Sequence, residues 1–382
     1  MKILMVPSWY ITEDKPMNGI FFKEQAKALI SAGHDVRVVY PDVRFKLGKL
    51  PRGLISGGDD PKTYIMRRRT FTPFSERGRR PLRARMLETL YGEATADWGA
   101  PDIVQLESCR IGPETLGLCA RHDLPVVYTE HYSGLLRGAD AVLGGAFRRT
   151  LDGCCAAVAV SSCLRDKMEP IRPDTVVVPN PVDTVKFRMT RPPQQIEHFT
   201  FAAMGALTSV KRYDLLIRAF ALAHSGLEGA KLVIAGDGPL REPLAALAKK
   251  LGVAGSVTFM GSVARERAPE FYNSVSCVVC SSDFETFGIT LIEALACGRP
   301  LISTSCGGPR DIVTPRNGVL VSPDDVGALA SAMRGIYGAF GRYDSDAIAA
   351  DCALRFGTVT FAKRMTEIYG ETIKERNASR KI

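Results

Sequence analysis

Short apolar runs alternate with stretches of helical periodicity from the start of the chain. Residues 2–6 form an apolar run that predicts a buried strand, and apolar side chains recur at helical spacing between residues 20 and 32. Residues 36–39 then form a second apolar run. A strand, a helix and another strand in this order are typical of a parallel sheet with helices on its faces.

The same alternation continues and then begins again in the second half of the chain. The stretch 188–197, which contains Pro192 and Pro193, separates the two sets of strands and is typical of a linker. We therefore predict an α/β protein with two Rossmann-like, doubly wound domains facing each other, and we expect a ligand in the cleft between them. The further predicted strands are 102–106, 126–129, 156–160 and 175–179 in the first half, and 199–205, 231–235, 257–261, 277–280 and a last turn and strand at 317–321 in the second.

Composition narrows the class of protein without changing this picture. The chain has 382 residues, which suits two domains of ordinary size, and its 50 Lys and Arg against 41 Asp and Glu give a net charge of +9. No apolar run approaches the length of a membrane-spanning helix, and residues 1–7 lack the pattern of a secretory signal peptide. The sequence thus predicts a cytoplasmic protein.

The ten cysteines fit a reducing compartment. Cys154, Cys155, Cys277 and Cys280 lie in apolar runs, where cysteine acts as a small hydrophobic residue. Cys277 and Cys280 have CxxC spacing, but they lie inside a predicted strand and no second pair accompanies them. This argues against a zinc site and against thioredoxin-like chemistry.

The positive charge is concentrated in one segment. Residues 44–85 contain thirteen basic and three acidic residues, so the rest of the chain is close to neutral. One interpretation is a peripheral contact with an anionic membrane, with a lipid-linked or anionic glycan acceptor. The other is an ordinary solvated loop. Nucleic acid is a less suitable partner, because the segment lacks aromatic stacking platforms and a recognition motif.

The stretch 281–300 carries the strongest functional signal. It follows the apolar strand 277–280 and predicts a helix that begins near Phe287 and ends at Gly298. The free N–H groups and partial positive charge of such a helix start favour an anion. Glu293 lies among apolar residues of this helix with no cation at helical spacing, so its carboxylate needs a donor from another element or from a ligand.

Three other residues lie where ligands approach parallel sheets. Gly19 belongs to the loop after the first strand, His131 directly follows the strand 126–129, and Lys211 lies in the loop after the strand 199–205. Each also has a plain structural interpretation. The glycine can be part of a turn, the histidine can satisfy a backbone carbonyl, and the lysine can be solvated.

Several motifs together resemble a known family. Glu285 and Glu293 have seven residues between them across a Phe-Gly-Ile turn, and residues 296–300 read Ala-Cys-Gly-Arg-Pro before a Gly307-Gly308 loop. This pattern resembles the nucleotide-sugar site of the family-four glycosyltransferases, which are retaining enzymes with the GT-B architecture. The Thr-Glu-His sequence that ends at His131 is similar to the acceptor-side histidine of that family. The resemblance covers nearly the whole chain and is weakest between residues 43 and 93.

The resemblance implies a domain arrangement. The last helix of GT-B enzymes crosses back to the first domain. We therefore expect an N-terminal acceptor domain formed by residues 1–188 together with a C-terminal helix at 358–382. Residues 189–357 are expected to form the nucleotide-sugar donor domain.

The resemblance also assigns roles to single residues. Lys211 and the amides of residues 287–289 would hold the donor diphosphate, Glu293 the ribose and Glu285 the donor sugar. His131 would lie beside the anomeric carbon. The expected catalytic residues are His131, Lys211 and Glu285, and the expected donor-binding residues are Gly19, Gly205, Arg212, Gly236, Phe287, Gly288, Ile289 and Glu293, with Arg310 as a further phosphate contact.

One position departs from the family pattern. The phosphate-binding loop of the family has an arginine directly after its glycine, whereas Ala206 follows Gly205 here. Half of the cationic clamp on the diphosphate is then missing unless Arg212 or Arg310 supplies it.

The expected reaction is transfer of a sugar from a nucleotide diphosphate donor, uridine-linked by preference, to a hydroxyl of a glycan, lipid-linked or small-molecule acceptor. No metal and no cofactor are expected. Asp344-Ser345-Asp346 is a formal DxD sequence, but its place in a polar connection is typical of a helix cap. Two alternatives remain open, namely a nucleotide-sugar epimerase or hydrolase of the same fold and an inactive sugar-nucleotide sensor.

Overall fold

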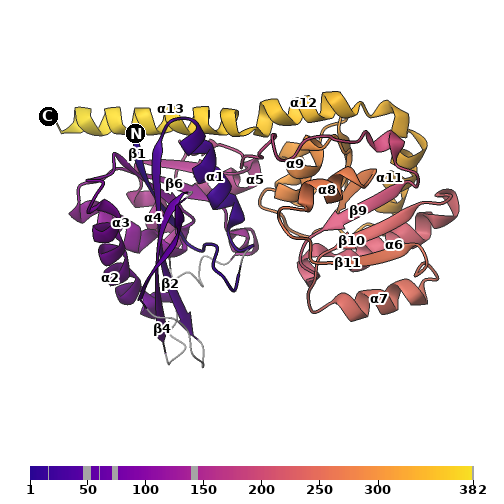
Figure 1. The fold of residues 1–382 in the computed structure, drawn as a ribbon, viewed down its shortest axis with the longest axis horizontal. Coiled ribbons are helices and arrows are strands. Elements are labelled where there is room, and N and C mark those ends of the chain that lie inside the picture. The colour runs from indigo at the N-terminus through magenta and orange to yellow at the C-terminus, as the bar shows by residue number, and fades with distance from the viewer. Residues whose placement is uncertain (16, 46–52, 60, 71–75, 139–144, 381–382) are drawn as a thin grey trace. The chain divides into compact units, whose positions relative to one another are not determined.

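The computed structural model describes the chain except for residues 16, 46–52, 60, 71–75, 139–144 and 381–382. The chain folds into two compact units (Figure 1). The first unit contains Met1–Pro181 and Thr358–Ile382, and the second contains Val182–Gly357. The sequence suggested a boundary at residue 188, but the second unit begins earlier, at Val182. The Val182 N–H donates to the Phe356 carbonyl of the second unit at 2.8 Å.

The first unit is built on an eight-stranded sheet in the order β3-β4-β2-β1-β5-β6-β7-β8. Neighbouring strands are parallel except for β3 and β4, which are antiparallel. The strand order reverses at β1, which pairs with β2 on one side and with β5 on the other. The strands are β1 (Lys2–Pro7), β2 (Asp35–Phe45), β3 (Gly53–Asp59), β4 (Lys62–Thr70), β5 (Ile103–Glu107), β6 (Val126–Glu130), β7 (Ala156–Ala159) and β8 (Val176–Val177).

The segment between residues 44 and 85 is more regular than the sequence indicated. It contains β3, β4 and the start of the long helix α2 (Glu76–Thr95), and β4 pairs with β2 along its whole length. The other helical elements of this unit are α1 (Ile20–Ser31), η1 (Cys109–Ile111), α3 (Gly112–Arg121), η2 (Ser133–Arg137), α4 (Ala146–Gly153), α5 (Ser162–Met168) and α13 (Thr358–Ser379).

The C-terminal helix α13 belongs to the core of the first unit. It packs against α1 and buries Phe361, Met365 and Tyr369 among the apolar side chains of β1, β2 and α1. The Tyr369 hydroxyl donates to Oε1 of Gln105 in β5 at 3.0 Å. The helix is therefore fixed to the sheet by apolar packing and by a buried hydrogen bond.

The second unit is built on a six-stranded parallel sheet in the order β11-β10-β9-β12-β13-β14. Its order reverses at β9, which pairs with β10 and with β12. Ligands of such sheets bind beyond the carboxyl ends of the strands at the reversal. The elements are β9 (Thr200–Met204), α6 (Tyr213–Ala223), β10 (Lys231–Ala235), α7 (Arg241–Lys250), β11 (Val257–Gly261), α8 (Ala268–Asn273), β12 (Cys277–Cys280), α9 (Ile289–Ala296), β13 (Leu301–Thr304), α10 (Pro309–Ile312), β14 (Gly318–Val321), α11 (Val326–Gly338) and α12 (Ser345–Phe356), with short helical turns η3 (Pro193–Gln195), η4 (Ser209–Lys211), η5 (His224–Gly226) and η6 (Phe340–Arg342).

The described helices include none that is both long and apolar enough to cross a membrane.

The contact between α13 and the sheet gives a first prediction. Tyr369→Phe removes the hydroxyl that bonds Gln105, so we expect the free energy of unfolding of the first unit to fall by about 1 kcal/mol. Trp9 and Trp98 both lie in this unit, so tryptophan fluorescence during urea unfolding follows it alone.

Tyr337→Phe is the matched control, because the Tyr337 hydroxyl donates to the Glu228 carbonyl in the second unit. Its tryptophan transition should be that of the unchanged protein. An equal transition for Tyr369→Phe and the unchanged protein would contradict a stabilising role for the Gln105 contact.

Candidate active site

The loops that follow β9 and β12 meet beyond the sheet of the second unit. The Asp283 N–H donates to the Val210 carbonyl at 2.8 Å, and the Ser281 hydroxyl donates to the Lys211 carbonyl at 2.8 Å. These bonds join the loop before α6 to the loop before α9. They lie where the strand order reverses, which is the ligand-binding edge of such a sheet.

An ion pair between Lys211 and Glu285 lies at the centre of these loops. The Lys211 Nζ donates to Glu285 Oε1 at 2.5 Å, and the Ser282 hydroxyl donates to the same oxygen at 2.8 Å. Burial of Lys211 favours its neutral form, but the Glu285 carboxylate outweighs this effect and raises the pKa of Lys211 above its ordinary value. The side chain is therefore a fixed cation at neutral pH.

Arg212, the next residue, is held by carboxylates of the protein. Its guanidinium donates to Asp214 at 3.2 Å, to Asp283 at 2.9 Å and to Asp324 at 2.7 Å. Arg310 is exposed, and its Nε donates to the carbonyl and the hydroxyl of Ser305. Position 206, where the family has an arginine, is thus occupied by Ala206, and both Arg212 and Arg310 bond to other groups of the protein.

The turn before α9 is fixed by backbone contacts. The Gly308 N–H donates to the Glu285 carbonyl at 2.8 Å, and a Cβ on Gly308 would lie 2.3 Å from backbone atoms of Phe287. Gly288 has a φ of 116° and caps the helix, which begins at Ile289. The sequence placed the start of this helix within two residues of the observed one.

Gly205 and Gly236 pack against each other at the ends of β9 and β10. A Cβ on Gly236 would lie 1.9 Å from the Gly205 carbonyl oxygen. The close approach of two backbones is therefore sufficient to explain a glycine at position 236.

Glu293 obtains its hydrogen-bond donors from other elements of the second unit. Its side chain is 2% exposed, one carboxylate oxygen pairs with Arg265, and the other accepts a bond from the Tyr272 hydroxyl at 3.0 Å. Burial and the Glu293 carboxylate raise the pKa of Tyr272 well above its ordinary value, so the hydroxyl remains a donor. The sequence left open whether another element or a ligand supplies the donor to Glu293, and other elements of the fold do supply one.

Arg299 fixes the end of α8, which carries Tyr272. It is fully buried and donates to the carbonyls of Tyr272 at 2.7 Å and Asn273 at 2.9 Å, which hold the end of α8. Burial lowers the pKa of Arg299 to about 10, which leaves the group charged at neutral pH. The arginine of the Ala-Cys-Gly-Arg-Pro sequence therefore positions Tyr272 against Glu293.

His131 lies in the first unit at the carboxyl end of β6. Its Nε2 is 2.6 Å from Oε2 of Glu107, at the end of the neighbouring strand β5, and both side chains are almost fully buried. Because a carboxylate only accepts hydrogen bonds, Nε2 carries the proton. The rings of Phe21 and Phe22 lie within about 5 Å of the imidazole, at 5.1 and 5.0 Å between centroids.

Gly19 lies at the start of α1 with a φ of 76°, against Trp9 and Phe22. The close contact with these two residues is sufficient to require a glycine there. Asp344 caps α12 by accepting a bond from the Ala347 N–H at 3.0 Å, so the DxD sequence contains a helix cap, as expected.

Two residues of the site were not found from the sequence. Glu107 directly follows the apolar strand next to that of His131, and this position was the signal that could have pointed to it. Arg265 lies in the loop between β11 and α8 and gave no signal, because its ion pair with Glu293 joins residues 28 positions apart in the chain.

Comparisons with known proteins identify the family. Residues 19–186 match the family described as Glycosyltransferase Family 4, and residues 190–337 match that described as Glycosyl transferases group 1. The chain belongs to the family-four glycosyltransferases. The resemblance found in the sequence is thereby confirmed.

Individual relatives of this glycosyltransferase are consistent with this family assignment. D-inositol 3-phosphate glycosyltransferase 2 of Catenulispora acidiphila is 34% identical over 189 residues, which are 46% of this chain and 44% of that protein. Glycogen synthase of Mycobacterium tuberculosis is 24% identical over 88% of this chain and 86% of its own length. The first two curated relatives are matched over less than half of their own length.

Solved structures show the same fold. Sucrose-phosphate synthase from Thermosynechococcus elongatus has a TM-score of 0.78 and 17% identity, covering 98% of this chain and 100% of that one. Anabaena HepE, described in complex with UDP and glucose, has a TM-score of 0.75 and 18% identity, covering 97% and 100%. The predicted GT-B fold with two Rossmann-like domains is confirmed.

The environment of Glu293 gives a second prediction. Tyr272→Phe removes the hydroxyl that donates to the buried Glu293 carboxylate, so we expect the second unit to lose about 1–3 kcal/mol of unfolding free energy. Thermal unfolding followed by circular dichroism measures the change.

Tyr337→Phe serves here as a control in the same unit, because its hydroxyl bonds a partly exposed carbonyl. If the two variants lose the same stability, the Tyr272–Glu293 bond contributes nothing beyond a surface hydrogen bond.

Proposed function

We propose that the protein transfers a sugar from a nucleotide diphosphate donor to an acceptor hydroxyl with retention of the anomeric configuration. The observation that carries this proposal is the Lys211–Glu285 ion pair beside the start of α9, at the reversal of strand order in the second unit. A cation, a carboxylate and a helix start at one point suit a ligand with both phosphate and hydroxyl groups.

The donor is proposed to be uridine-linked. HepE, a protein of the same fold, is described with UDP and with UDP-glucose.

Each residue then has a role. Lys211 and the amides of residues 287–289 neutralise the diphosphate as it leaves, and Glu285 accepts bonds from hydroxyls of the donor sugar. Glu293 holds the ribose, and Arg265 and Tyr272 hold Glu293. No metal and no cofactor take part in the proposed reaction.

His131 is proposed to lie beside the anomeric carbon. Glu107 fixes its ring and its tautomer. Nδ1 is buried and has no hydrogen-bond partner in the described part of the chain, so it is the nitrogen assigned to accept a bond from the donor sugar. In the transfer the bond from the anomeric carbon to the phosphate oxygen breaks, a bond to the acceptor oxygen forms on the same face, and the leaving phosphate takes the acceptor proton.

A peripheral contact of segment 44–85 with anionic membrane is the remaining element of the proposal. Arg68 and Arg85 of this segment are exposed, whereas Arg67 and Arg83 are buried. Only part of the positive charge therefore faces outward, where it can attract anionic lipid.

Product analysis tests the proposed function. The protein is incubated with a panel of nucleotide sugars, with and without a panel of glycan, lipid-linked and small acceptors, and products are identified by mass spectrometry. We expect a glycosylated acceptor with the anomeric configuration of the donor. Free sugar or an epimerised donor as the sole product would indicate the hydrolase or epimerase alternative, and binding without any product would indicate a sensor.

The ribose assignment gives a third prediction. Glu293→Gln removes one charged hydrogen bond to the nucleotide, so we expect the affinity for UDP to fall by about tenfold or more. Isothermal titration calorimetry measures it. Tyr272→Phe is the control, because it lowers stability through the same carboxylate and leaves the charge in place, and its UDP affinity should stay close to that of the unchanged protein.

An unchanged UDP affinity for Glu293→Gln would show that Glu293 has only the structural role seen in its contacts with Arg265 and Tyr272.

A further inference from the structure

Glu130, the last residue of β6, carries a buried carboxylate to which the proposed function gives no role. The residue is fully buried and directly precedes His131. In the part of the chain that the structure describes, no cationic side chain pairs with it. A buried charge without a counter-ion is costly unless hydrogen bonds compensate for the lost water, so the surroundings of Glu130 must provide donors.

Five neutral donors surround this carboxylate. They are the hydroxyls of Ser108 and Tyr128 and the backbone N–H groups of Cys109, His131 and Tyr132. The Ser108 hydroxyl lies 2.7 Å from one carboxylate oxygen, and the Cys109 nitrogen lies 3.2 Å from the other. Burial and the Glu130 charge raise the pKa of Tyr128 well above its ordinary value, so its hydroxyl remains a donor. An ionised carboxylate only accepts hydrogen bonds, and all five contacts satisfy that need.

The donors come from two loops that follow neighbouring strands. Residues 108–109 follow β5, and residues 131–132 follow β6, which pairs with β5. The Glu130 side chain therefore links the two loops. The same strand ends carry Glu107 and His131, whose side chains bond each other at 2.6 Å.

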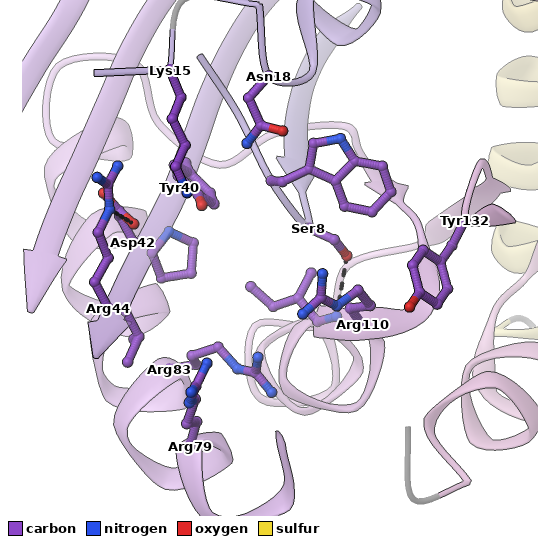
Figure 2. Close-up of a pocket in the computed structure, with 14 residues that line it drawn as sticks. Ser8, Lys15, Asn18, Tyr40, Asp42, Arg44, Arg79, Arg83, Arg110 and Tyr132 are labelled. Atoms are coloured by element: carbon purple, nitrogen blue, oxygen red, sulfur yellow. Dashed lines mark hydrogen bonds and ion pairs between the residues drawn. The ribbon is translucent and has the colours of Figure 1, made fainter. Parts of the chain in front are cut away.

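Ser108 has an unusual backbone conformation at this junction. Its φ of 68° and ψ of 147° belong to a region that residues other than glycine rarely occupy. Its N–H donates to the Thr129 carbonyl at 2.8 Å, and its carbonyl accepts from the Ser8 hydroxyl at 2.8 Å. The Ser8 hydroxyl in turn accepts from the Ile111 N–H at 3.2 Å (Figure 2). Such strain persists only where surrounding bonds fix it, and it is common at functional sites.

We propose that Glu130 is a positioning residue, which fixes the two loops so that the His131 imidazole keeps one orientation during sugar transfer. This inference rests on the proposed function, because that function places His131 beside the anomeric carbon. Glu107 holds the ring through Nε2, and Glu130 holds the backbone N–H of the same residue at 2.6 Å. Both ends of His131 are thus bonded to carboxylates, and small displacements of a catalytic group are costly to the rate.

The contacts favour a role for the reach of Glu130 over a role for its charge. Glu107 already places a carboxylate against the imidazole. Only the length of the Glu130 side chain lets it bond residues 108–109 as well as residues 131–132. An aspartate keeps the charge but is one methylene shorter. A glutamine keeps the length and one acceptor oxygen, and loses one acceptor because its NH₂ group only donates.

The first test follows the imidazole of His131 by NMR on the full chain labelled with ¹⁵N-histidine, and His131→Asn identifies its signals among the five histidines. We expect the Nε2 proton to exchange with water about tenfold faster in Glu130→Asp than in the unchanged protein, because bonds that hold the loops are lost. Ser108→Ala, which removes one donor, should exchange faster as well.

Thr150→Val is the matched control. It removes a buried hydroxyl in the same unit, which donates to the Ala146 carbonyl of its own helix at 2.6 Å. Its Nε2 exchange rate should stay within about twofold of the unchanged protein. An exchange rate in Glu130→Asp equal to that of the unchanged protein or of Thr150→Val would overturn the inference. If Glu130→Asp does not fold, Ser108→Ala decides in the same way.

The second test measures kcat and KM with the donor and acceptor that the product panel identifies. Loss of positioning lowers kcat and leaves KM for the nucleotide sugar within about twofold, since the residues assigned to the donor lie in the second unit. We expect kcat to fall by about tenfold or more in Glu130→Asp and by less in Glu130→Gln. An unchanged kcat in folded Glu130→Asp, or a larger loss in Glu130→Gln than in Glu130→Asp, would overturn the inference.

Failure of this inference and failure of the proposed function give different results. Sugar transfer that both Glu130 variants perform at the unchanged rate keeps the proposed function and removes the positioning role. Absence of transfer from every nucleotide sugar to every acceptor removes the proposed function, and the catalytic role of Glu130 with it, whatever the NMR result.

Discussion

In a parallel sheet all strands present their carboxyl ends at one edge, and this constraint determines where the chemistry of both units lies. In the first unit the order reverses at β1. Glu107 is the last residue of β5, and Trp9 and His131 lie just after β1 and β6. In the second unit the order reverses at β9, and the loops after β9 and β12 carry Lys211 and Glu285. Residues far apart in the chain lie close together because the strands that they end or follow are neighbours in the sheet.

Buried polar groups then connect these edges to the rest of each unit. The Tyr369 hydroxyl on α13 donates to Gln105, the Gln105 amide donates to Glu107 at 3.1 Å, and Glu107 accepts from His131. The C-terminal helix thus contributes to the orientation of the imidazole through two intermediates. An unpaired buried carboxylate is costly, so Glu107 lowers the free energy of the fold only while these donors stay in place.

The sequence predicted those strands and helix starts that follow from the local pattern of apolar residues. The apolar runs indicated most strands of the two sheets but not β13, and the spacing of Glu285 and Glu293 indicated a loop and helix start that the structure contains. It did not predict the length of β2, the hairpin of β3 and β4, or the partners of Glu293 and His131. Arg265 and Glu107 pair with residues more than twenty positions away. Periodicity carries no information about such pairs, because the pairing follows from strand order.

Under the proposed function, the distribution of charge in the second unit determines which cation a donor diphosphate would meet. Three carboxylates bind Arg212, and Ala206 offers no cation, so under the proposed function Lys211 would carry the cationic part of the binding. Its ammonium has three N–H donors and gives one to Glu285, which leaves it able to serve a phosphate at the same time. Glu285 in turn accepts from Lys211 and Ser282 through one oxygen, and a carboxylate has room for about four bonds. If a nucleotide sugar binds as proposed, the ion pair need not break, since Lys211 would bind the diphosphate and Glu285 the sugar.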